Sequence, residues 1–197
     1  MKVNIAVFAS GSGTNAENLI RYFRANPVAR VRLIVCNKPD AYVLQRAESL
    51  RVETLVIDRK NWQQPDKLVR ELQKRRIELI VLAGFLWLVP EKLIDAFPGR
   101  IINIHPALLP KYGGKGMYGD KVHESVKRNR ETETGITIHF VDKQYDTGSI
   151  ISQKKVEINP WLFSAGYIAK KVHELEYEWY PKIVEQVAEG IGKEKEN

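Results

Sequence analysis

The chain has 197 residues, 44% of them hydrophobic and 28% charged, so it is long enough for one α/β domain with a substantial core. No apolar run approaches the roughly 20 residues that a membrane-spanning helix needs, which argues against membrane insertion. The net charge of +7 favours anionic ligands, but the Lys and Arg residues are dispersed, so a phosphorylated or carboxylated small molecule explains it as well as nucleic acid does.

The single cysteine and the first residues are both typical of a cytoplasmic protein. Cys36 ends an apolar run, where a lone thiol is expected to be part of the core, and one cysteine permits no intrachain disulfide. Residues 1–9 lead into a glycine-rich turn instead of a cleavage site, so we interpret them as a buried strand and not as a signal peptide. We therefore expect a cytoplasmic location.

The pattern of apolar residues in the first part of the chain predicts strands that alternate with helices. Strands are expected at 3–9, 31–36, 53–57 and 78–83, and helices at 15–25, 40–50 and 66–75. Nearly continuous apolar strands are typical of a parallel sheet that is buried on both faces, with right-handed crossovers. Ligands are then expected beyond the carboxyl ends of the strands.

The sequence of the second part of the chain predicts further strands, a long loop and a last helix. A short helix at 90–96 precedes a strand at 101–105, and the following loop, 106–119, holds four glycines and two prolines, which is typical of a functional loop. A helix near 119–129, strands near 134–142 and 149–157, and a helix from 165 to 189 complete a mostly parallel seven-stranded sheet with helices on both faces. Trp161 and Phe163 are expected in the core, with exposed aromatics that mark an interface as the alternative, and residues 191–197 are expected as a disordered tail.

A glycine-rich turn at residues 10–16 follows the first strand and opens the first helix. Within it, Thr14 and Glu17 have the spacing of a capping box. The N–H groups of such a turn and the positive end of the helix bind anions, which predicts phosphate binding by Gly13, Thr14 and Asn15. For an isolated motif, a tight turn that needs glycine and binds nothing is nearly as common.

The same turn matches the dinucleotide-binding pattern, Gly11-x-Gly13-x-x-Ala16, so a nicotinamide-dependent enzyme is a serious alternative. Such an enzyme normally has an acidic residue at the end of the second strand, where it binds the ribose hydroxyls. Here that strand ends in Asn37 and Lys38, and the nearest acid, Asp40, lies beyond a proline. This favours a single phosphate over a dinucleotide.

Asn103 and His105 lie two residues apart in a predicted strand, so their side chains project from the same face at its carboxyl end. A lone buried histidine is more often structural, but an unpaired polar side chain in an apolar strand costs about 1–3 kcal/mol. Asp146 lies in a later turn from which it could reach His105, although Asp-Thr-Gly is also a common turn sequence. Together the three would stabilise an oxyanion and move protons at an acyl carbon.

Covalent and metal catalysis are not indicated by the residues near this group. No activated Ser or Cys lies close in sequence, and four scattered histidines with one cysteine lack metal-ligand spacing. Direct transfer without a metal is the simpler hypothesis.

At these residues the sequence resembles the folate-dependent formyltransferases, and among them the glycinamide ribonucleotide transformylases. The resemblance runs from the first strand into the last helix and is carried by residues 8–15, 81–85, 102–114 and 135–141. The Asn-Ile-His-Pro-x-Leu-Leu-Pro element followed by Asp146-x-Gly148 is specific to the superfamily, and the Gly-Ser-Gly-Thr-Asn loop narrows the resemblance to the ribonucleotide enzymes. A single-domain Rossmann-like formyltransferase fold is implied, with 1–100 as its nucleotide and phosphate-binding half and 101–190 as its catalytic and folate-binding half.

The resemblance implies a reaction of de novo purine (IMP) biosynthesis. The amine of 5-phosphoribosylglycinamide would attack the formyl carbon of 10-formyltetrahydrofolate, and a tetrahedral intermediate would collapse to release tetrahydrofolate. Asn103 and a protonated His105 would stabilise the oxyanion. Asp146 would orient His105 and, through water, help to carry a proton from the amine to the departing folate nitrogen.

The resemblance also implies the binding residues. The ribonucleotide would contact Gly11, Ser12, Gly13, Thr14, Asn15, Gly84 and Glu176, the last through its ribose hydroxyls, although Glu176 by itself reads as an exposed helical carboxylate. The folate would contact Leu86, Trp87, Leu88, Val89, Asn103, Asp142 and Asp146. Well-known relatives carry Arg at the position of Trp87, so an apolar contact is expected to replace a polar one. Lys111 or Arg100 would meet carboxylate or phosphate charge.

Other formyl-folate enzymes and a binding protein remain as alternatives. A methionyl-tRNA formyltransferase would need an extra basic C-terminal domain and a formyl-folate hydrolase an N-terminal regulatory one, and 197 residues leave room for neither. A sugar-amine formyltransferase differs only in its acceptor. A non-catalytic nucleotide-binding module would not need Asn103 and His105 opposite Asp146. We expect small-molecule partners, no nucleic acid or membrane, and a monomer or homodimer.

Overall fold

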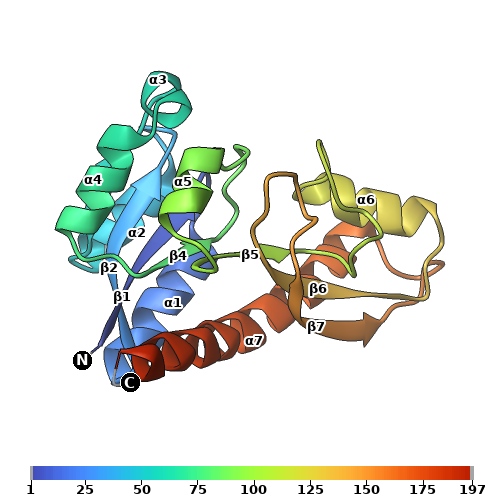
Figure 1. Cartoon of the computed structure of the whole chain (residues 1–197). Helices are drawn as coiled ribbons and strands as arrows, with labels where there is room; N and C mark the ends of the chain where they lie inside the picture. Colours follow the sequence, from blue (N-terminus) through green and yellow to red (C-terminus); the bar gives the residue numbers. More distant parts are fainter. Residues whose placement is uncertain (1, 196–197) are drawn as a thin grey trace.

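A seven-stranded sheet runs through the computed structural model, which describes residues 2–195 (Figure 1). Its strand order is β3-β2-β1-β4-β5-β6-β7. The strands are β1 (Val3–Ala9), β2 (Ala29–Cys36), β3 (Glu53–Val56), β4 (Leu79–Leu82), β5 (Ile101–His105), β6 (Glu133–Phe140) and β7 (Ile150–Glu157). Strands β1 to β5 run parallel, whereas β6 is antiparallel to β5 and to β7. The predicted mostly parallel sheet is confirmed, and its order reverses between β1 and β4, where open α/β sheets bind ligands.

Helices cover both faces of the sheet, as predicted. They are α1 (Thr14–Ala25), α2 (Tyr42–Ser49), α3 (Arg59–Gln63), α4 (Asp66–Lys74), α5 (Glu91–Ala96), α6 (Asp120–Arg128) and α7 (Ala165–Glu194). One core cluster joins the sheet to α1, α2, α6 and α7, and a second joins it to α3, α4 and α5. Strand β1 serves both clusters because its side chains alternate: Ile5 and Val7 belong to the first, and Ala6 and Phe8 to the second.

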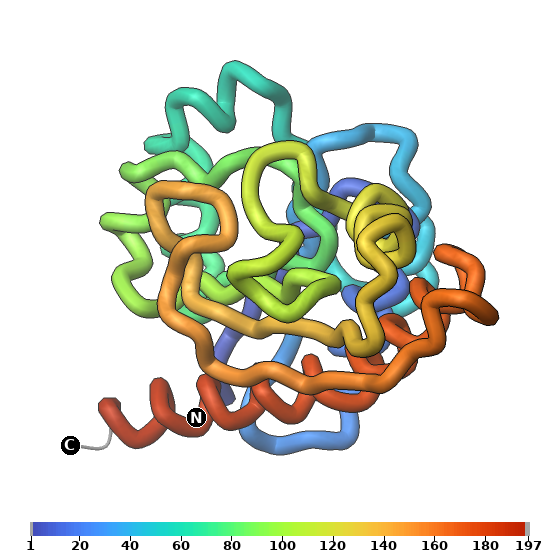
Figure 2. Tube along the Cα trace, turned by 90° about the vertical axis from the view of Figure 1, so that its right-hand side faces the viewer, coloured from blue at the N-terminus to red at the C-terminus, as the bar shows by residue number. Residues whose placement is uncertain are grey.

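The last helix, α7, is longer than the sequence predicted. It was expected to end near residue 189 and to be followed by a disordered tail from residue 191, but it continues to Glu194. The prediction is wrong because Gly190 and Gly192 suggest a helix end, whereas Ile191 between them is only 3% exposed and joins the core. In Figures 1 and 2, α7 crosses the molecule from the β6–β7 end to the side of the N-terminus. Residues 196–197 lie outside the described residues.

Of the smaller predictions, one is confirmed and one is wrong, and one short helix was not predicted. The short helix α3 was not expected, and its Trp62 is buried in the second core cluster. Cys36 is buried, as predicted. Phe163 packs against the first core cluster, but Trp161 is 71% exposed, with the Arg130 guanidinium 4.6 Å from its ring centroid, so its predicted place in the core is wrong. This cation–π contact leaves most of the indole in solvent.

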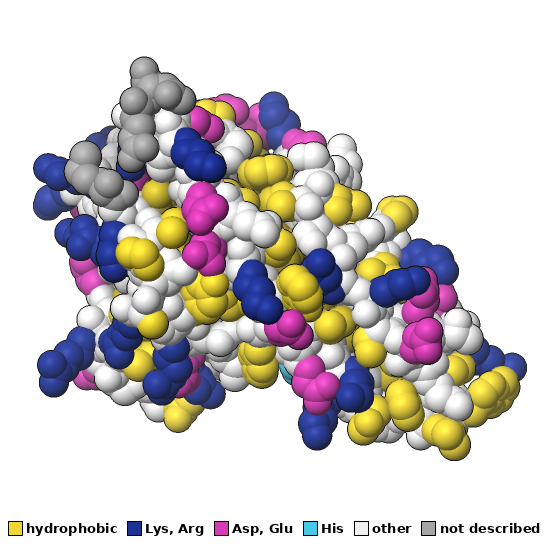
Figure 3. Space-filling view, turned by 90° about the horizontal axis from the view of Figure 1, so that it is seen from below, with side chains coloured by type: hydrophobic (Ala, Val, Ile, Leu, Met, Phe, Trp, Pro, Cys, Tyr) yellow, Lys and Arg dark blue, Asp and Glu magenta, His cyan; other side chains and the backbone are white. Residues whose placement is uncertain are grey.

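The surface carries dispersed charges. On the face seen in Figure 3, Lys and Arg side chains lie among acidic and hydrophobic ones and do not gather in one patch. Within residues 2–195, no helix is long and apolar enough to cross a membrane.

Candidate functional site

A cavity of about 640 Å³ opens at the carboxyl ends of β1, β4 and β5. Its wall consists of residues 10–15, 82–89, 103–106 and 114–120, parts of the loop after β6, and Lys38, His123, His139, His173 and Glu176. Figure 2 shows the loop after β5 beside the loop after β6, which together border this end of the sheet. The cavity therefore lies where a ligand was predicted.

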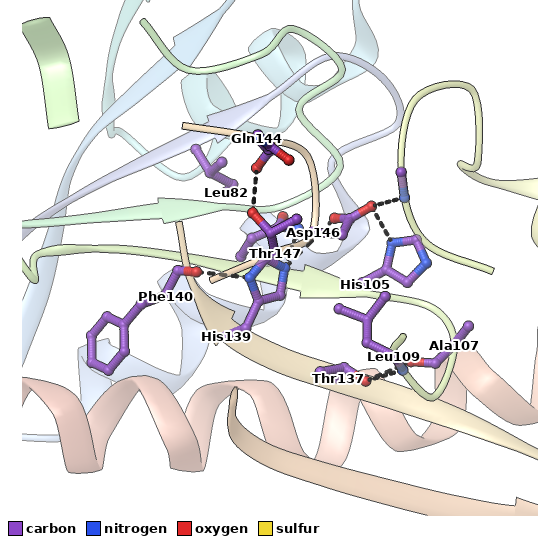
Figure 4. A network of polar contacts seen from close by, with 12 residues as sticks. Leu82, His105, Ala107, Leu109, Thr137, His139, Phe140, Gln144, Asp146 and Thr147 are labelled. Atoms are coloured by element: carbon purple, nitrogen blue, oxygen red, sulfur yellow. Dashed lines mark hydrogen bonds and ion pairs between the residues drawn. The ribbon is translucent and has the colours of Figure 1, made fainter. Parts of the chain in front are cut away.

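Asp146 holds these two loops together. Its Oδ2 accepts a hydrogen bond of 2.8 Å from the Gly114 N–H and lies 3.5 Å from His105 Nδ1 (Figure 4). The residue has a φ of 57°, in the left-handed region that Asp tolerates better than most residues. Hydrogen bonding and the neighbouring histidines lower the pKa of its carboxyl group, although burial opposes them. The structure thus brings His105 and Asp146 together, as predicted.

His105 is held in one tautomer by the loop that follows it. Its Nε2 lies 2.7 Å from the Tyr112 carbonyl oxygen, which can only accept, so Nε2 carries a proton and donates it. Burial lowers the pKa of His105, although the Asp146 carboxylate raises it. Burial therefore opposes the protonated imidazole that the resemblance implies, whereas Asp146 favours it. The Nδ1 atom of His105 faces the Asp146 carboxylate.

His139 is a second imidazole in the group, and it was not among the predicted site residues. It lies directly opposite Asn103 in the antiparallel pair of β5 and β6, so the two side chains share a face. Its Nδ1 donates to the Phe140 carbonyl oxygen at 2.8 Å, and its Nε2 lies 3.1 Å from Asn103 Nδ2 and 3.6 Å from Asp146 Oδ1. Figure 4 shows Asp146 between His105 and His139. The signal was available, because His139 is also polar within an apolar strand.

The glycine-rich turn has the backbone geometry of an anion site. Gly13 precedes α1 as its N-cap with a φ of 75°, and an added Cβ would lie 2.4 Å from Val43 Cγ2. The first N–H groups of a helix have no intrahelical acceptor and are free for a ligand. The predicted capping box is wrong, because no side chain caps α1 and Glu17 pairs with Arg21 and Arg46 instead.

Glu176 joins this turn to the last helix. It is 5% exposed, and its Oε2 accepts hydrogen bonds of 2.8 Å from Asn15 Nδ2 and from His173 Nδ1. The alternative of an exposed helical carboxylate is therefore wrong. Its hydrogen bond raises the pKa of His173. Because Oε2 takes both bonds, Oε1 is left to accept from a ligand.

The opposite end of the cavity is apolar. Leu86, Trp87, Leu88 and Val89 line it, together with Asp142. The Trp87 ring packs 6.1 Å from Phe85 and 6.0 Å from Trp62 between centroids, and the Arg59 guanidinium lies 4.9 Å from its centroid. Ser10 Oγ accepts from the Leu86 N–H at 3.1 Å, which ties this segment to the glycine-rich turn. This part of the cavity wall therefore presents aromatic and aliphatic side chains.

Comparison with known proteins places this site in a family. The formyl transferase family model matches residues 3–184. The chain belongs to the formyl transferase family. It is 37% identical to phosphoribosylglycinamide formyltransferase of Bacillus subtilis over 187 residues, covering 92% of this chain and 93% of that one. The Haemophilus influenzae enzyme of the same name is 35% identical over 198 residues, covering 98% and 91%.

Solved structures of formyl transferases have the same fold. Glycinamide ribonucleotide transformylase 1 from Geobacillus kaustophilus superposes with a TM-score of 0.86 and 35% identity, covering 95% of this chain and 100% of that one. Phosphoribosylglycinamide formyltransferase from Bacillus halodurans gives a TM-score of 0.84 and 35% identity, covering 93% and 94%.

Within this formyl transferase cavity, the structure gathers every predicted binding residue except the two auxiliary cations. Lys111 pairs with Glu131 at 3.0 Å, and Arg100 pairs with Glu194 at 2.6 Å, so neither lines the cavity. That prediction is wrong because both side chains point to surface partners that sequence spacing does not reveal. Lys38 and Lys115 are the cations in the wall instead.

The histidines of this formyl transferase are expected to titrate in a definite order. Burial holds the pKa of His105 and of His123 below the ordinary 6.5, whereas Glu176 holds that of His173 above it. NMR titration of the imidazole protons measures these values. In Asp146→Asn, the pKa of His105 should fall further, because the carboxylate charge raises it. A His105 pKa above that of His173 would contradict this electrostatic description.

Proposed function

We propose that the chain is a phosphoribosylglycinamide formyltransferase that transfers the formyl group of 10-formyltetrahydrofolate to 5-phosphoribosylglycinamide in de novo purine biosynthesis. The observation that carries the proposal is one continuous cavity lined by the glycine-rich turn, by Asn103, His105 and Asp146, and by the apolar residues 86–89. Relatives that carry this name and match nearly the whole chain support it.

The phosphate group would anchor the ribonucleotide in the cavity. The N–H groups around Gly13, Thr14 and Asn15 would bind the phosphate, because these groups and the helix dipole favour an anion. Glu176 Oε1 would accept from the ribose hydroxyls, since Oε2 already has two donors. The glycinamide amine then points along the cavity toward His105.

The catalytic steps follow from the hydrogen bonds of the three residues. Asn103 Nδ2 has two protons, of which one faces His139, so the other is free to donate to the formyl oxygen. As negative charge develops on that oxygen, His105 takes up at Nδ1 the proton that the attacking amine releases, and the imidazolium is stabilised between the Tyr112 carbonyl and Asp146. Asp146 and water would then carry this proton to the folate nitrogen as the bond between the formyl carbon and that nitrogen breaks. Preorganised groups of this kind typically contribute a rate factor of about 10²–10³ each.

The formyl donor occupies the apolar end in this proposal. Leu86, Trp87, Leu88 and Val89 would receive the pterin, and Asp142 would lie over it. The donor supplies the formyl group, and no metal is invoked. We also propose that residues 1–100 act as the phosphate-binding half and 101–190 as the catalytic and folate-binding half, in a cytoplasmic monomer or homodimer without nucleic-acid or membrane partners.

A spectrophotometric assay of formyl transfer tests the proposal. A 10-formyl folate is supplied with glycinamide ribonucleotide, with a sugar-nucleotide amine, or without an acceptor. Turnover that requires glycinamide ribonucleotide is expected. Folate release without an acceptor would identify a hydrolase, turnover with the sugar amine would identify a different acceptor class, and inactivity in all three reactions would return the chain to the binding-module alternative.

A further inference from the structure

His123 is a buried histidine in the cavity wall that the proposed mechanism does not use. It lies in α6, is 2% exposed and lines the cavity. Its Nδ1 is buried and has no hydrogen-bond partner. A buried nitrogen without a partner destabilises the fold, so its presence needs a reason.

A second unpartnered atom lies in the same wall. Asn15 donates through Nδ2 to Glu176, but its Oδ1 is buried without a donor. Among the described residues, the other unpartnered buried atoms are in Asn37 and Thr134, which do not line the cavity. Two side chains of the cavity wall, Asn15 and His123, therefore each keep one polar atom without a partner in the protein.

His123 lies beside the ribose end of the proposed ribonucleotide site. Its ring centroid lies 6.4 Å from that of His173, the hydrogen-bond partner of Glu176. The charged groups that act on it are His173, Glu176, Asp120 and His105, so it lies within electrostatic reach of both the ribose end and the catalytic end. Burial lowers its pKa, which favours the neutral imidazole. A neutral imidazole suits a hydroxyl or an amide better than a phosphate dianion.

We infer that His123 binds the ribonucleotide substrate, and that its imidazole hydrogen-bonds a neutral hydroxyl or amide group on the segment between the phosphate and the reacting amine. Asn15 Oδ1 accepts from a hydroxyl or N–H of the same segment. This inference rests on the proposed function for the identity of the ligand. It makes His123 a substrate-binding residue that is held in the unliganded protein at a cost in stability.

Three variants test this role. His123→Leu removes the polar atoms, His123→Asn places an amide near the position of Nδ1, and Ser125→Ala is a control on the same helix. Ser125 is buried, bonds the Lys121 carbonyl and does not line the cavity. In His123→Leu we expect the KM for glycinamide ribonucleotide to rise about tenfold or more, with the KM for the formyl folate and kcat within about threefold. His123→Asn should recover part of the loss, and Ser125→Ala should show none.

Thermal unfolding and calorimetry separate binding from structure. Because His123→Leu removes an unsatisfied buried group, the Tm of its unliganded form should be no lower than that of the wild type. The affinity of His123→Leu for inorganic phosphate should be unchanged. Its loss of affinity for ribose 5-phosphate is then compared with its loss of affinity for glycinamide ribonucleotide. Equal losses mean that His123 binds the hydroxyls, and a loss confined to glycinamide ribonucleotide means that it binds the amide. A lower Tm with unchanged ribonucleotide affinity would make His123 a structural residue and overturn the inference. Wild-type protein that binds the ribonucleotide without turnover would contradict the proposed function alone.

Discussion

The Asp146→Asn variant is expected to lose roughly 10²–10⁴-fold in kcat while it binds glycinamide ribonucleotide nearly as well as the wild type. Asn retains an oxygen that can accept from the Gly114 N–H, so the two loops stay joined. It lacks the negative charge that stabilises an imidazolium at His105, 3.5 Å away. The lost interaction therefore exists mainly in the transition state, which lowers kcat and leaves ground-state binding intact.

Steady-state kinetics and titration calorimetry with glycinamide ribonucleotide measure the two quantities separately. His105→Ala provides a partner variant, because residues that act as a unit are not additive. If Asp146 works through His105, then Asp146→Asn in the His105→Ala background should cost much less than it does alone. Additive losses, or a collapse of ribonucleotide affinity in Asp146→Asn, would mean that Asp146 has another role.

The parts of this site that could be predicted are those set by local sequence. The apolar run of β1, the glycines after it and the helix that follows specify a strand-turn-helix unit, and parallel strands place its turn at the ligand edge. Alternation along β5 places Asn103 and His105 on one face without any tertiary information. The resemblance to formyltransferases then assigned Asp146 and Glu176 to the same site.

The parts that could not be predicted depend on register between distant segments. His139 enters the site only because β6 pairs with β5 antiparallel, with His139 opposite Asn103. Asn15 and Glu176 are 161 residues apart and meet only when α7 packs beside α1. A capping box was predicted from spacing alone, but Arg46 of α2 takes the Glu17 carboxylate, because a charged partner was available in the fold.

The second large effect is expected in the glycine-rich turn, where Gly13→Ala should destabilise the protein by about 2–5 kcal/mol. The residue has a positive φ, which costs an L residue about 1–2 kcal/mol. In addition, the new Cβ would lie 2.4 Å from Val43 Cγ2 and 2.8 Å from its Cα, and crowding of this kind typically costs about 1–3 kcal/mol. Because the Val43 backbone is involved, a rotamer change cannot relieve the contact.

Thermal unfolding of variants at two other glycines separates the backbone strain from the steric contact. Gly84 has a φ of +74° but open space around its Cβ position, so Gly84→Ala tests the backbone strain alone. Gly11 has open space and no positive φ, so Gly11→Ala should change the unfolding free energy by less than about 0.5 kcal/mol. For a chain of this size, 1 kcal/mol shifts the Tm by roughly 2–4 °C. The Tm should therefore fall most in Gly13→Ala, less in Gly84→Ala and hardly at all in Gly11→Ala.

The effect of Gly13→Ala on binding follows from the same displacement. Moving residue 13 away from Val43 shifts the N–H groups that open α1, and these are the groups proposed to bind the phosphate. Calorimetry below the Tm should show the affinity for glycinamide ribonucleotide reduced about tenfold or more, with the KM for the formyl folate little changed. Full affinity in a destabilised Gly13→Ala protein would place the phosphate elsewhere in the cavity, where Lys38 and Lys115 are the cations to test next.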